Sequence, residues 1–178
     1  MAGYVALLRG IGPGNPNMRN EHLRRVFREL GFDSPRTVIS SGNVVFDSDS
    51  DDIATMEAAL EAAWPDRLGF SSTTIIQARS QIQQLVDADP YRGLAHGRES
   101  YLLVTFFKRP PPTDAPLPVP PRDEPYRLLG LAAGALCSVT DTTVAKTPDL
   151  MSWLEREYGQ QISSRTWNTV RRIQAKMR

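Results

Sequence analysis

The stretch Ser40–Phe46, which reads SSGNVVF, places a compact polar turn directly before an apolar, β-branched run. Glycine and asparagine tolerate the positive φ angles that tight hairpins require, so we predict a two-residue turn at Gly42-Asn43. We expect strands at 36–40 and 44–47 to flank that turn. Turn chemistry alone explains both residues, whereas a functional role for Ser41 or Asn43 further requires that the turn faces a cleft.

The segments around this hairpin complete the order β-α-β-β-α-β over residues 1–78. A short apolar run, Tyr4–Leu8, predicts a buried strand, and Thr73–Ala78 predicts the last strand of the series. Apolar stripes at helical spacing indicate two helices between these strands: Leu23, Val26, Phe27 and Leu30 in the first, and Ile53, Met56, Leu60 and Ala63 in the second. This order is that of a ferredoxin-like fold, also called an α/β plait.

Polar residues and glycines mark the ends of these two helices. We expect Asn17 to cap the N-terminus of the first helix and Gly31 to end it. Residues 49–52 supply acidic cap candidates for the second helix. Three arginines fall outside the apolar stripe of the first helix, and we expect them to lie in water: Arg24, Arg25 and Arg28.

The second half of the chain also has an α+β pattern, with a helix at 79–88 and a strand at 99–108. A hairpin with Ala133-Gly134 at its turn follows, and then a helix that Thr147 caps and Gly159 ends. The last helix is predicted at about 165–176. We therefore expect an N-terminal plait subdomain at 1–78 and a C-terminal α+β subdomain at 79–178.

Residues 110–125 form a loop that holds eight prolines. Such a segment is either a docking site for a proline-reading module or an ordered, semi-stiff surface loop. The surface loop is the favoured interpretation.

The composition excludes several classes of function. One cysteine, Cys137, excludes an internal disulfide, and His22 and His96 cannot form a strong metal site by themselves, so we expect no metal and no cofactor. The net charge of +1 neither favours nor disfavours a polyanionic partner. No apolar stretch approaches the roughly 20 residues that span a bilayer, and the N-terminal residues lack a signal-peptide pattern. We predict a cytoplasmic protein without a membrane partner.

Three segments together resemble one protein family. They are YVALLRGIG at residues 4–12, ISSGNVVF at residues 39–46 and SSRTWNTV at residues 163–170. In order and spacing they are similar to DUF1697, the SP0830-like proteins of unknown function, over residues 3 to about 173. The resemblance implies two subdomains of α/β-plait type, and thus a fold for the second half that the pattern alone does not supply. It implies no reaction, because the family has no agreed activity.

The chain departs from the family pattern at three places. Residues 12–17 stand where the family usually carries an asparagine and a Gly-Gly pair followed by basic residues. Thr166 replaces an asparagine in the last motif, and Ala145-Lys146-Thr147 replaces a serine-lysine-leucine element. An activity that depends on the replaced side chains is not expected in this chain.

The loop that begins Arg9-Gly10 lies between a predicted strand and a predicted helix, which is where phosphate-binding loops occur. No Gly-Lys-Ser/Thr follows, and the third glycine of a dinucleotide fingerprint is missing, so a plain connecting loop is favoured. Arg9 ends the first strand, and there it either faces a cleft or forms a structural ion pair.

The C-terminal segment carries the second group of candidates. Arg165, Trp167, Asn168 and Thr169 combine a cation, an aromatic ring and polar groups, which suits a ligand site. Between Arg165 and Arg178 there is no acidic residue, so a basic helix face could bind phosphate backbones through Arg171, Arg172 and Lys176. The alternative is a packed amphipathic helix whose charged face is solvated, and this alternative is favoured.

We therefore expect a binding protein for a small anionic ligand or nucleic acid. The alternatives are an enzyme that acts on a small anionic metabolite in a cleft between the subdomains, and a dimerising structural module that uses the apolar side of the last helix. A monomer or a homodimer is expected. The residues predicted to bind a ligand are Arg9, Gly10, Ser41, Asn43, Lys146, Arg165, Trp167, Asn168 and Thr169.

Overall fold

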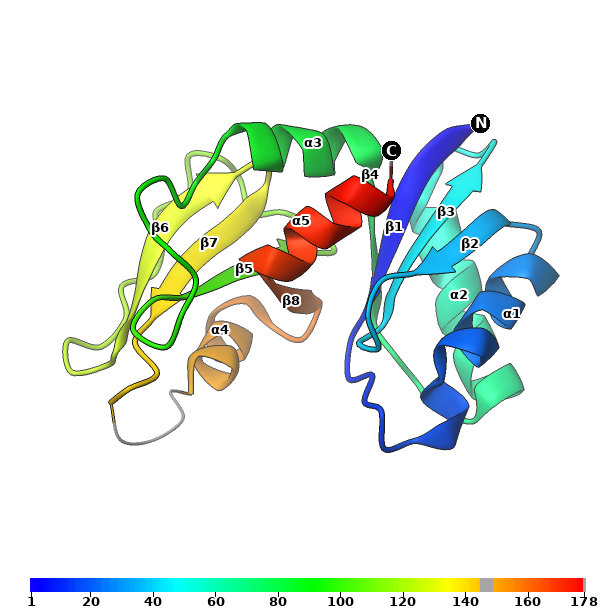
Figure 1. The fold of residues 1–178 in the computed structure, drawn as a ribbon, viewed down its shortest axis with the longest axis horizontal. Helices are drawn as coiled ribbons and strands as arrows, with labels where there is room; N and C mark the ends of the chain where they lie inside the picture. Colours follow the sequence, from blue (N-terminus) through cyan, green and yellow to red (C-terminus); the bar gives the residue numbers. More distant parts are fainter. Residues whose placement is uncertain (145–148, 178) are drawn as a thin grey trace. The chain divides into compact units, whose positions relative to one another are not determined.

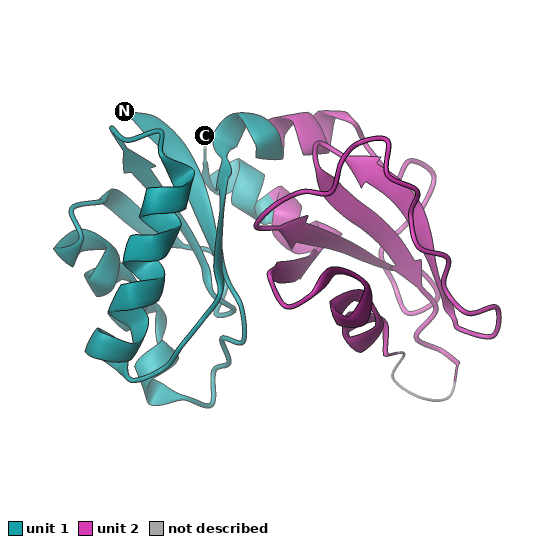
Figure 2. Cartoon of the chain, turned by 180° about the vertical axis from the view of Figure 1, so that it is seen from behind, with its two compact units in different colours: residues 1–82, 172–178 teal, residues 83–171 magenta. Residues whose placement is uncertain are grey.

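A computed structural model describes residues 1–144 and 149–177 (Figure 1). The chain divides into two compact units, shown in different colours in Figure 2: unit 1 comprises residues 1–82 and 172–178, and unit 2 comprises residues 83–171. The elements are, in order, β1 (Ala2–Leu8), η1 (Pro16–Met18), α1 (Asn20–Glu29), β2 (Asp33–Thr37), β3 (Asn43–Ser48), α2 (Ile53–Leu68), β4 (Thr74–Ala78), α3 (Arg79–Asp87), β5 (Tyr101–Phe107), β6 (Tyr126–Ala132), β7 (Ala135–Thr140), α4 (Leu150–Tyr158), β8 (Ile162–Thr166) and α5 (Trp167–Lys176).

Unit 1 is a ferredoxin-like fold, as predicted. Its four strands lie in the order β2-β3-β1-β4, and all neighbouring strands are antiparallel. Helices α1 and α2 cover the same face of this sheet (Figure 1). That face buries the apolar stripes read from the sequence, with Phe27, Phe46 and Trp64 at the centre of the core.

The opposite face of this sheet is also apolar. Val5, Leu7, Val45 and Ile75 alternate with the residues of the helix-covered face, and each is at most 1% exposed. These four side chains are aliphatic, so they offer no aromatic ring on which nucleic-acid bases could stack, as bases do on RNA-recognition modules.

Side chains cover one edge of this sheet. β4 is an edge strand, and three of its backbone N–H groups donate to side chains: Thr74 to Glu61 Oε1 at 2.9 Å, Ile76 to Glu57 Oε1 at 2.8 Å and Ala78 to Gln81 Oε1 at 2.8 Å. Unpaired edge groups invite pairing with another chain, so these contacts protect β4 from strand addition.

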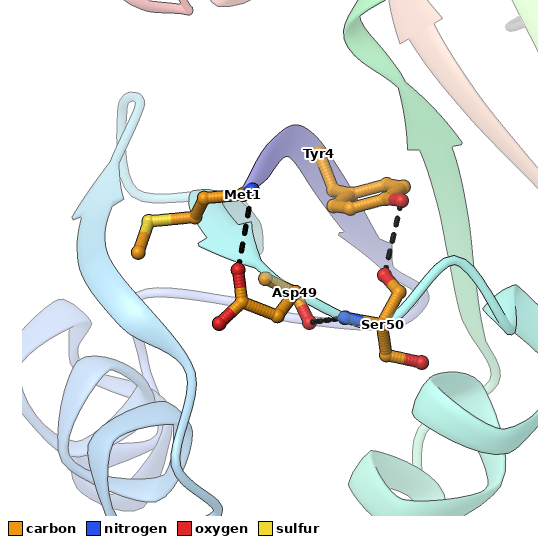
Figure 3. Close-up of polar contacts among 5 residues, drawn as sticks. Met1, Tyr4, Asp49 and Ser50 are labelled. Atoms are coloured by element: carbon orange, nitrogen blue, oxygen red, sulfur yellow. Dashed lines mark hydrogen bonds and ion pairs between the residues drawn. The ribbon is translucent and has the colours of Figure 1, made fainter.

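Polar contacts also tie the start of β1 to the segment that follows β3. The amino group of Met1 lies 3.2 Å from Asp49 Oδ1, and the Tyr4 hydroxyl donates to the carbonyl of Ser50 at 3.1 Å (Figure 3). Two residues later, Asp52 caps α2 by accepting the N–H of Thr55 at 3.0 Å, which confirms the predicted acidic cap.

Unit 2 repeats the strand order of unit 1. Its sheet runs β6-β7-β5-β8, with all neighbours antiparallel, and α4 joins β7 to β8. The predicted hairpin is confirmed at β6 and β7, with positive φ at Ala133 (47°) and Gly134 (77°). Unit 2 has no helix between β5 and β6, where α1 stands in unit 1.

The proline-rich segment makes this β5–β6 crossover. Every residue from Ala115 to Pro121 either is a proline or precedes one, which fixes φ and favours extended backbone. Leu117 packs against the core of unit 2, while Val119 is 86% exposed. The segment is thus an ordered crossover that covers part of the core, rather than a linker between domains.

Three predicted helix starts need comment. Asn17 is not the cap of α1: it lies in η1, where its N–H donates to the side chain of Asn15, and α1 begins three residues later. The last helix begins at Trp167 and not at Arg165, because residues 162–166 form strand β8. The predicted cap Thr147 lies outside the described residues, and α4 begins at Leu150, directly after Asp149.

Candidate anion-binding site

The SSGN stretch forms a longer turn than its sequence predicts. β2 ends at Thr37 and β3 begins at Asn43, and the N–H of Val38 donates to the carbonyl of Asn43 at 2.9 Å. Positive φ occurs at Ile39 (51°) and Gly42 (75°), not at Asn43. The predicted two-residue turn at Gly42-Asn43 is therefore wrong, because the loop comprises residues 38–42.

Asn43 closes this loop with its side chain. Its Nδ2 donates to the carbonyl of Val38 and to Ser41 Oγ, both at 3.0 Å, and the residue is fully buried. The Asn43 side chain thus bonds to two groups of the loop that precedes it, the Val38 carbonyl and the Ser41 hydroxyl. These contacts give Asn43 a structural role, while a ligand contact by Ser41 or Asn43 stays a prediction.

Gly42 brings the loop against the end of β1. Its carbonyl accepts the N–H of Leu8 at 2.8 Å. A Cβ at this position would lie 2.7 Å from Ile11 Cγ1 and 3.0 Å from Leu8 Cβ. Only glycine allows so close an approach at this φ, so the hairpin packs directly on the segment that follows β1.

The backbone at the end of β1 is also fixed. The N–H of Arg9 donates to the carbonyl of Thr73 at 2.9 Å, and Ser72 Oγ donates to the carbonyl of Arg9 at 2.8 Å. Gly10 then turns the chain with a φ of 73°. The side chain of Arg9 is half-buried.

A surface cavity of about 460 Å³ lies where this loop, the hairpin and α1 meet. The lining includes Pro13, from the loop that begins Arg9-Gly10, and Ser40, from the hairpin. Arg19, Asn20 and Arg24 line it from the start of α1. The SSGN hairpin is therefore one wall of a cavity in unit 1. Met18 and Glu21 complete the lining.

The arginines of this cavity have no carboxylate partner within the described residues. Arg24 Nη1 donates to Thr37 Oγ1 at 2.8 Å, and Arg24 is half-buried against β2. The prediction that Arg24 lies in water is therefore wrong. Among residues 1–144 and 149–177, neither Arg19 nor Arg24 forms an ion pair. Both positive charges are thus available to an anion that enters the cavity.

The first turn of α1 adds to this positive potential. Arg19 is the N-cap residue, and its side chain makes no capping hydrogen bond. The first N–H groups of a helix carry partial positive charge and attract anions. One carboxylate counteracts this potential, since Glu21 lies at the rim, with its Oε1 3.8 Å from His22 Nε2.

The C-terminal candidates lie together in unit 2, at the junction of β8 and α5. Arg165 donates from Nη1 to Ser163 Oγ and to the carbonyl of Ser164, both at 2.8 Å. Burial lowers the pKa of its guanidinium to about 10. Arg165 is a candidate for ligand binding in unit 2, and its role there stays a prediction.

The neighbours of Arg165 have structural contacts. Trp167 is buried, and its ring lies 5.3 Å from the ring of Tyr91 between centroids. Thr166 Oγ1 accepts the N–H of Thr169 at 3.2 Å, which makes Thr166 the cap of α5. The Thr169 hydroxyl also lies 2.9 Å from Thr166 Oγ1, so Thr169 has a structural contact, while Asn168 is exposed.

Other predicted residues are placed as follows. Arg171, Arg172 and Lys176 are exposed on α5, so the charged face of that helix is solvated and its binding of phosphates stays a prediction. Cys137 is buried, and burial raises the pKa of its thiol to about 11. His96 accepts the N–H of Leu102 at Nδ1, at 3.2 Å. Lys146 lies outside the described residues.

Residues 1–127 match the family described as "Protein of unknown function (DUF1697)". The chain belongs to the DUF1697 family.

A solved structure has the same fold as this DUF1697 protein over nearly the whole chain. It is described as "The structure of conserved bacterial protein SP0830 from Streptococcus pneumoniae", with 19% identity, a TM-score of 0.73 and coverage of 99% of each chain. This similarity shows the shared fold. The search among curated proteins found no match. Within the described part of this DUF1697 protein, no helix is long and apolar enough to cross a membrane.

The sequence analysis missed the arginines that define the cavity. The available signal was the spacing of Asn20, Arg24 and Arg28, which repeat every four residues and so lie along one side of the first helix. That side faces β2, since Asn20 Nδ2 donates to the carbonyl of Ile39 at 3.2 Å and Arg24 contacts Thr37. The sequence alone does not show that β2 lies on that side of the helix.

Proposed function

We propose that this DUF1697 protein binds an anionic ligand in the cavity formed by residues 10–17, the β2–β3 hairpin and the start of α1. The observation that carries the proposal is a pair of arginines, Arg19 and Arg24, that border the cavity without a carboxylate partner. The hydrogen bond to Thr37 also holds the Arg24 guanidinium in one position, which lowers the ordering cost when an anion binds.

The donors at this cavity suit an oxyanion such as a phosphate or a carboxylate. A guanidinium offers several N–H donors in a planar fork that matches two oxygens of such a group. Asn20 and Ser40 add neutral donors, and the N-terminus of α1 adds partial positive charge. A volume of about 460 Å³ lies in the range of ligand sites for small molecules.

A binding role is favoured over an enzymatic one because the cavity offers no nucleophile with an adjacent base. Among the described residues, Ser40 is the hydroxyl residue of the lining, Glu21 is its one carboxylate, and no histidine or lysine lines the cavity. An enzyme that uses Arg9, Asn43, Lys146, Arg165 and Asn168, and a dimer built on the last helix, both stay predictions. So do the cytoplasmic location and the monomeric or dimeric state.

Thermal unfolding with inorganic phosphate, pyrophosphate and tripolyphosphate tests the proposal. A ligand that binds only the folded chain raises the melting temperature, and the rise grows with the logarithm of ligand concentration once that exceeds the dissociation constant. We expect a rise with one or more of these anions that Arg19→Gln and Arg24→Gln each abolish. Arg122→Gln removes one charge from an exposed residue of unit 2, and we expect it to leave the rise unchanged.

A matched variant separates the charge of Arg24 from its packing. Thr37→Val removes the hydroxyl acceptor but keeps the guanidinium, so we expect it to weaken binding less than Arg24→Gln does. An equal rise in the wild-type chain and in both arginine variants would overturn the proposal. So would the absence of any rise with all three anions at low salt.

A further inference from the structure

A second surface cavity lies at the other end of the α1–β2 contact. Its volume is about 540 Å³, and its basic lining residues are Arg28, from the last turn of α1, and Arg36, from edge strand β2. Neither arginine forms an ion pair within residues 1–144 and 149–177. The acidic residue of the lining is Asp33, which is exposed.

One side of α1 connects the two cavities. Asn20 and Arg24 line the first cavity, and Arg28, one helical turn beyond Arg24, lines the second. At 1.5 Å per residue, Asn20 and Arg28 are about 12 Å apart along the helix axis. A single phosphate or a small carboxylate can occupy one of these cavities but cannot reach both.

The second cavity differs from the first in having an apolar wall. Phe32 and Pro35 contribute to its lining, and Phe32 is half-buried, with its ring centroid 4.9 Å from that of Phe46. An aromatic ring fixed in this way can stack against a planar base, and such stacking beside basic residues is typical of proteins that bind single strands. A duplex would keep its bases paired and would not use this wall.

Two polar features of the second cavity fit a nucleotide better than a simple anion. Asp33 would repel a phosphate placed beside it, but its carboxylate can accept an amino N–H of a base. The Nε–H of Arg36 is buried and has no hydrogen-bond partner in the described part of the chain. Buried donors in folded proteins are normally paired, so an unpaired one in a residue that lines this cavity is unusual. A ligand oxygen would pair with it only after the Arg36 side chain turns toward the cavity.

We propose that the α1–β2 side of unit 1 binds single-stranded nucleic acid, with phosphates at Arg19 and Arg24 in the first cavity and at Arg28 in the second, and with a base against Phe32 and Pro35. This inference rests on the proposed function, because it assigns a ligand class to the same arginines. It adds the second cavity, which a small anion does not need.

The test measures binding of a labelled deoxycytidylate dodecamer and of the matching dinucleotide by fluorescence anisotropy, from low to physiological salt. The dodecamer is expected to bind more tightly than the dinucleotide, because only the longer strand reaches both cavities. Arg28→Gln is expected to weaken dodecamer binding about tenfold or more. It should also make the plot of log affinity against log salt concentration less steep by about 0.7, which is the contribution of one phosphate contact on a single strand.

Tripolyphosphate separates this inference from the proposed function. Arg19→Gln is expected to reduce binding of both tripolyphosphate and the dodecamer, whereas Arg28→Gln should reduce only dodecamer binding. If tripolyphosphate binding depends on Arg19 but dodecamer binding is unaffected by Arg28→Gln, the proposed function stands and this inference falls. If no anion binds at the first cavity, the proposed function falls and this inference falls with it.

Four further variants make the result specific. Phe32→Leu should weaken dodecamer binding without changing the salt slope, because stacking releases no counterions; no loss of affinity would overturn the assignment of a base to Phe32. Arg36→Lys keeps a positive charge at this half-buried position. The urea midpoint of the Arg36→Lys variant shows whether its chain remains folded. The double variant Arg122→Gln/Arg127→Gln removes two exposed charges from unit 2 and should leave binding unchanged. Loss of dodecamer binding in Arg171→Gln/Arg172→Gln, with none in Arg28→Gln, would overturn the inference in favour of the basic face of α5.

Discussion

Replacing Gly42 by alanine tests whether the β2–β3 hairpin is positioned by its close approach to β1. The backbone at Gly42 has a φ of 75°, and a Cβ there would lie 2.7 Å from Ile11 Cγ1, 2.9 Å from Ile11 Cβ and 3.0 Å from Leu8 Cβ. Two effects therefore add: a left-handed backbone that alanine disfavours, and a steric clash with residues that lead into the first cavity.

The size of each effect follows from the geometry. A left-handed conformation costs an ordinary L-residue about 1–2 kcal/mol. Forcing an extra methyl group into a packed site costs about 1–3 kcal/mol more. We expect Gly42→Ala to lower the free energy of unfolding by about 2–5 kcal/mol, a large share of the roughly 5–15 kcal/mol that folded domains have.

Gly10 provides the matched control. Its φ of 73° is nearly that of Gly42, but a Cβ at Gly10 would meet nothing within 4 Å. Gly10→Ala should therefore lower the free energy of unfolding only by the cost of the left-handed backbone, about 1–2 kcal/mol. The difference between the two variants then measures the steric clash at Gly42. In the Gly42→Ala background, Ile11→Ala removes Cγ1 and should restore part of the loss, with a coupling energy of about 1 kcal/mol.

Urea unfolding followed by circular dichroism measures these differences, provided that the slope of free energy against urea is the same for each variant. A loss of about 3 kcal/mol lowers the urea midpoint by about 1–3 M at the slopes usual for small proteins. Equal midpoints for Gly42→Ala and Gly10→Ala would refute the argument, because the steric contribution would then be absent.

Three further predictions concern stability and reactivity. Thr74→Val should lower the free energy of unfolding by about 1–3 kcal/mol in urea, because the Trp64 indole N–H loses its 2.9 Å partner in a buried site, while Thr74→Ser should be milder. Asp52→Ala should lower the urea midpoint at pH 7. Because the hydrogen bond from the Thr55 hydroxyl lowers the pKa of Asp52 below its ordinary 3.8, the stabilisation is present above pH 3.8 and is lost as pH falls through the lowered pKa, so the difference from the wild-type chain should vanish at lower pH. Cys137 should not react with a thiol reagent at pH 8 until urea unfolds the chain, since burial raises the pKa of its thiol to about 11, and reaction of the folded chain would contradict its placement.

The N-terminal half illustrates what hydrophobic spacing predicts well. The apolar stripes of α1 and α2 have the helical period, whereas β1 and β4 are short apolar or β-branched runs whose length favours strands; all four elements form where the sequence places them. The order of these elements then restricts the topology, because a β-α-β-β-α-β series with right-handed crossovers has few compact arrangements.

The elements that the sequence did not predict lack such a period. β8 reads Ile-Ser-Ser-Arg-Thr, and these hydroxyl residues resemble a helix cap more than a strand. Its pairing with β5 is a tertiary contact, in which Thr105 and Ser164 join their hydroxyls at 2.7 Å across the two strands. The length of the β2–β3 loop was also missed, because the side-chain hydrogen bonds of Asn43 replace the turn geometry that the Gly-Asn pair usually indicates.

The two units show why the proposed site occurs once in each chain although the strand order occurs twice. In unit 1 the crossover from the first strand to the second contains α1, and one side of that helix lies along edge strand β2 with Asn20 and Arg24 in contact with the strand or its loop. In unit 2 the proline-rich segment makes the same crossover. Its prolines lack backbone N–H groups, so the segment is not helical and cannot place arginines along one side at every fourth residue. The row of basic side chains beside an edge strand thus depends on a helix that only one unit has, and a titration with a saturating ligand should give one bound strand per chain. A stoichiometry of two would require an equivalent site in unit 2, which the proline-rich crossover does not provide.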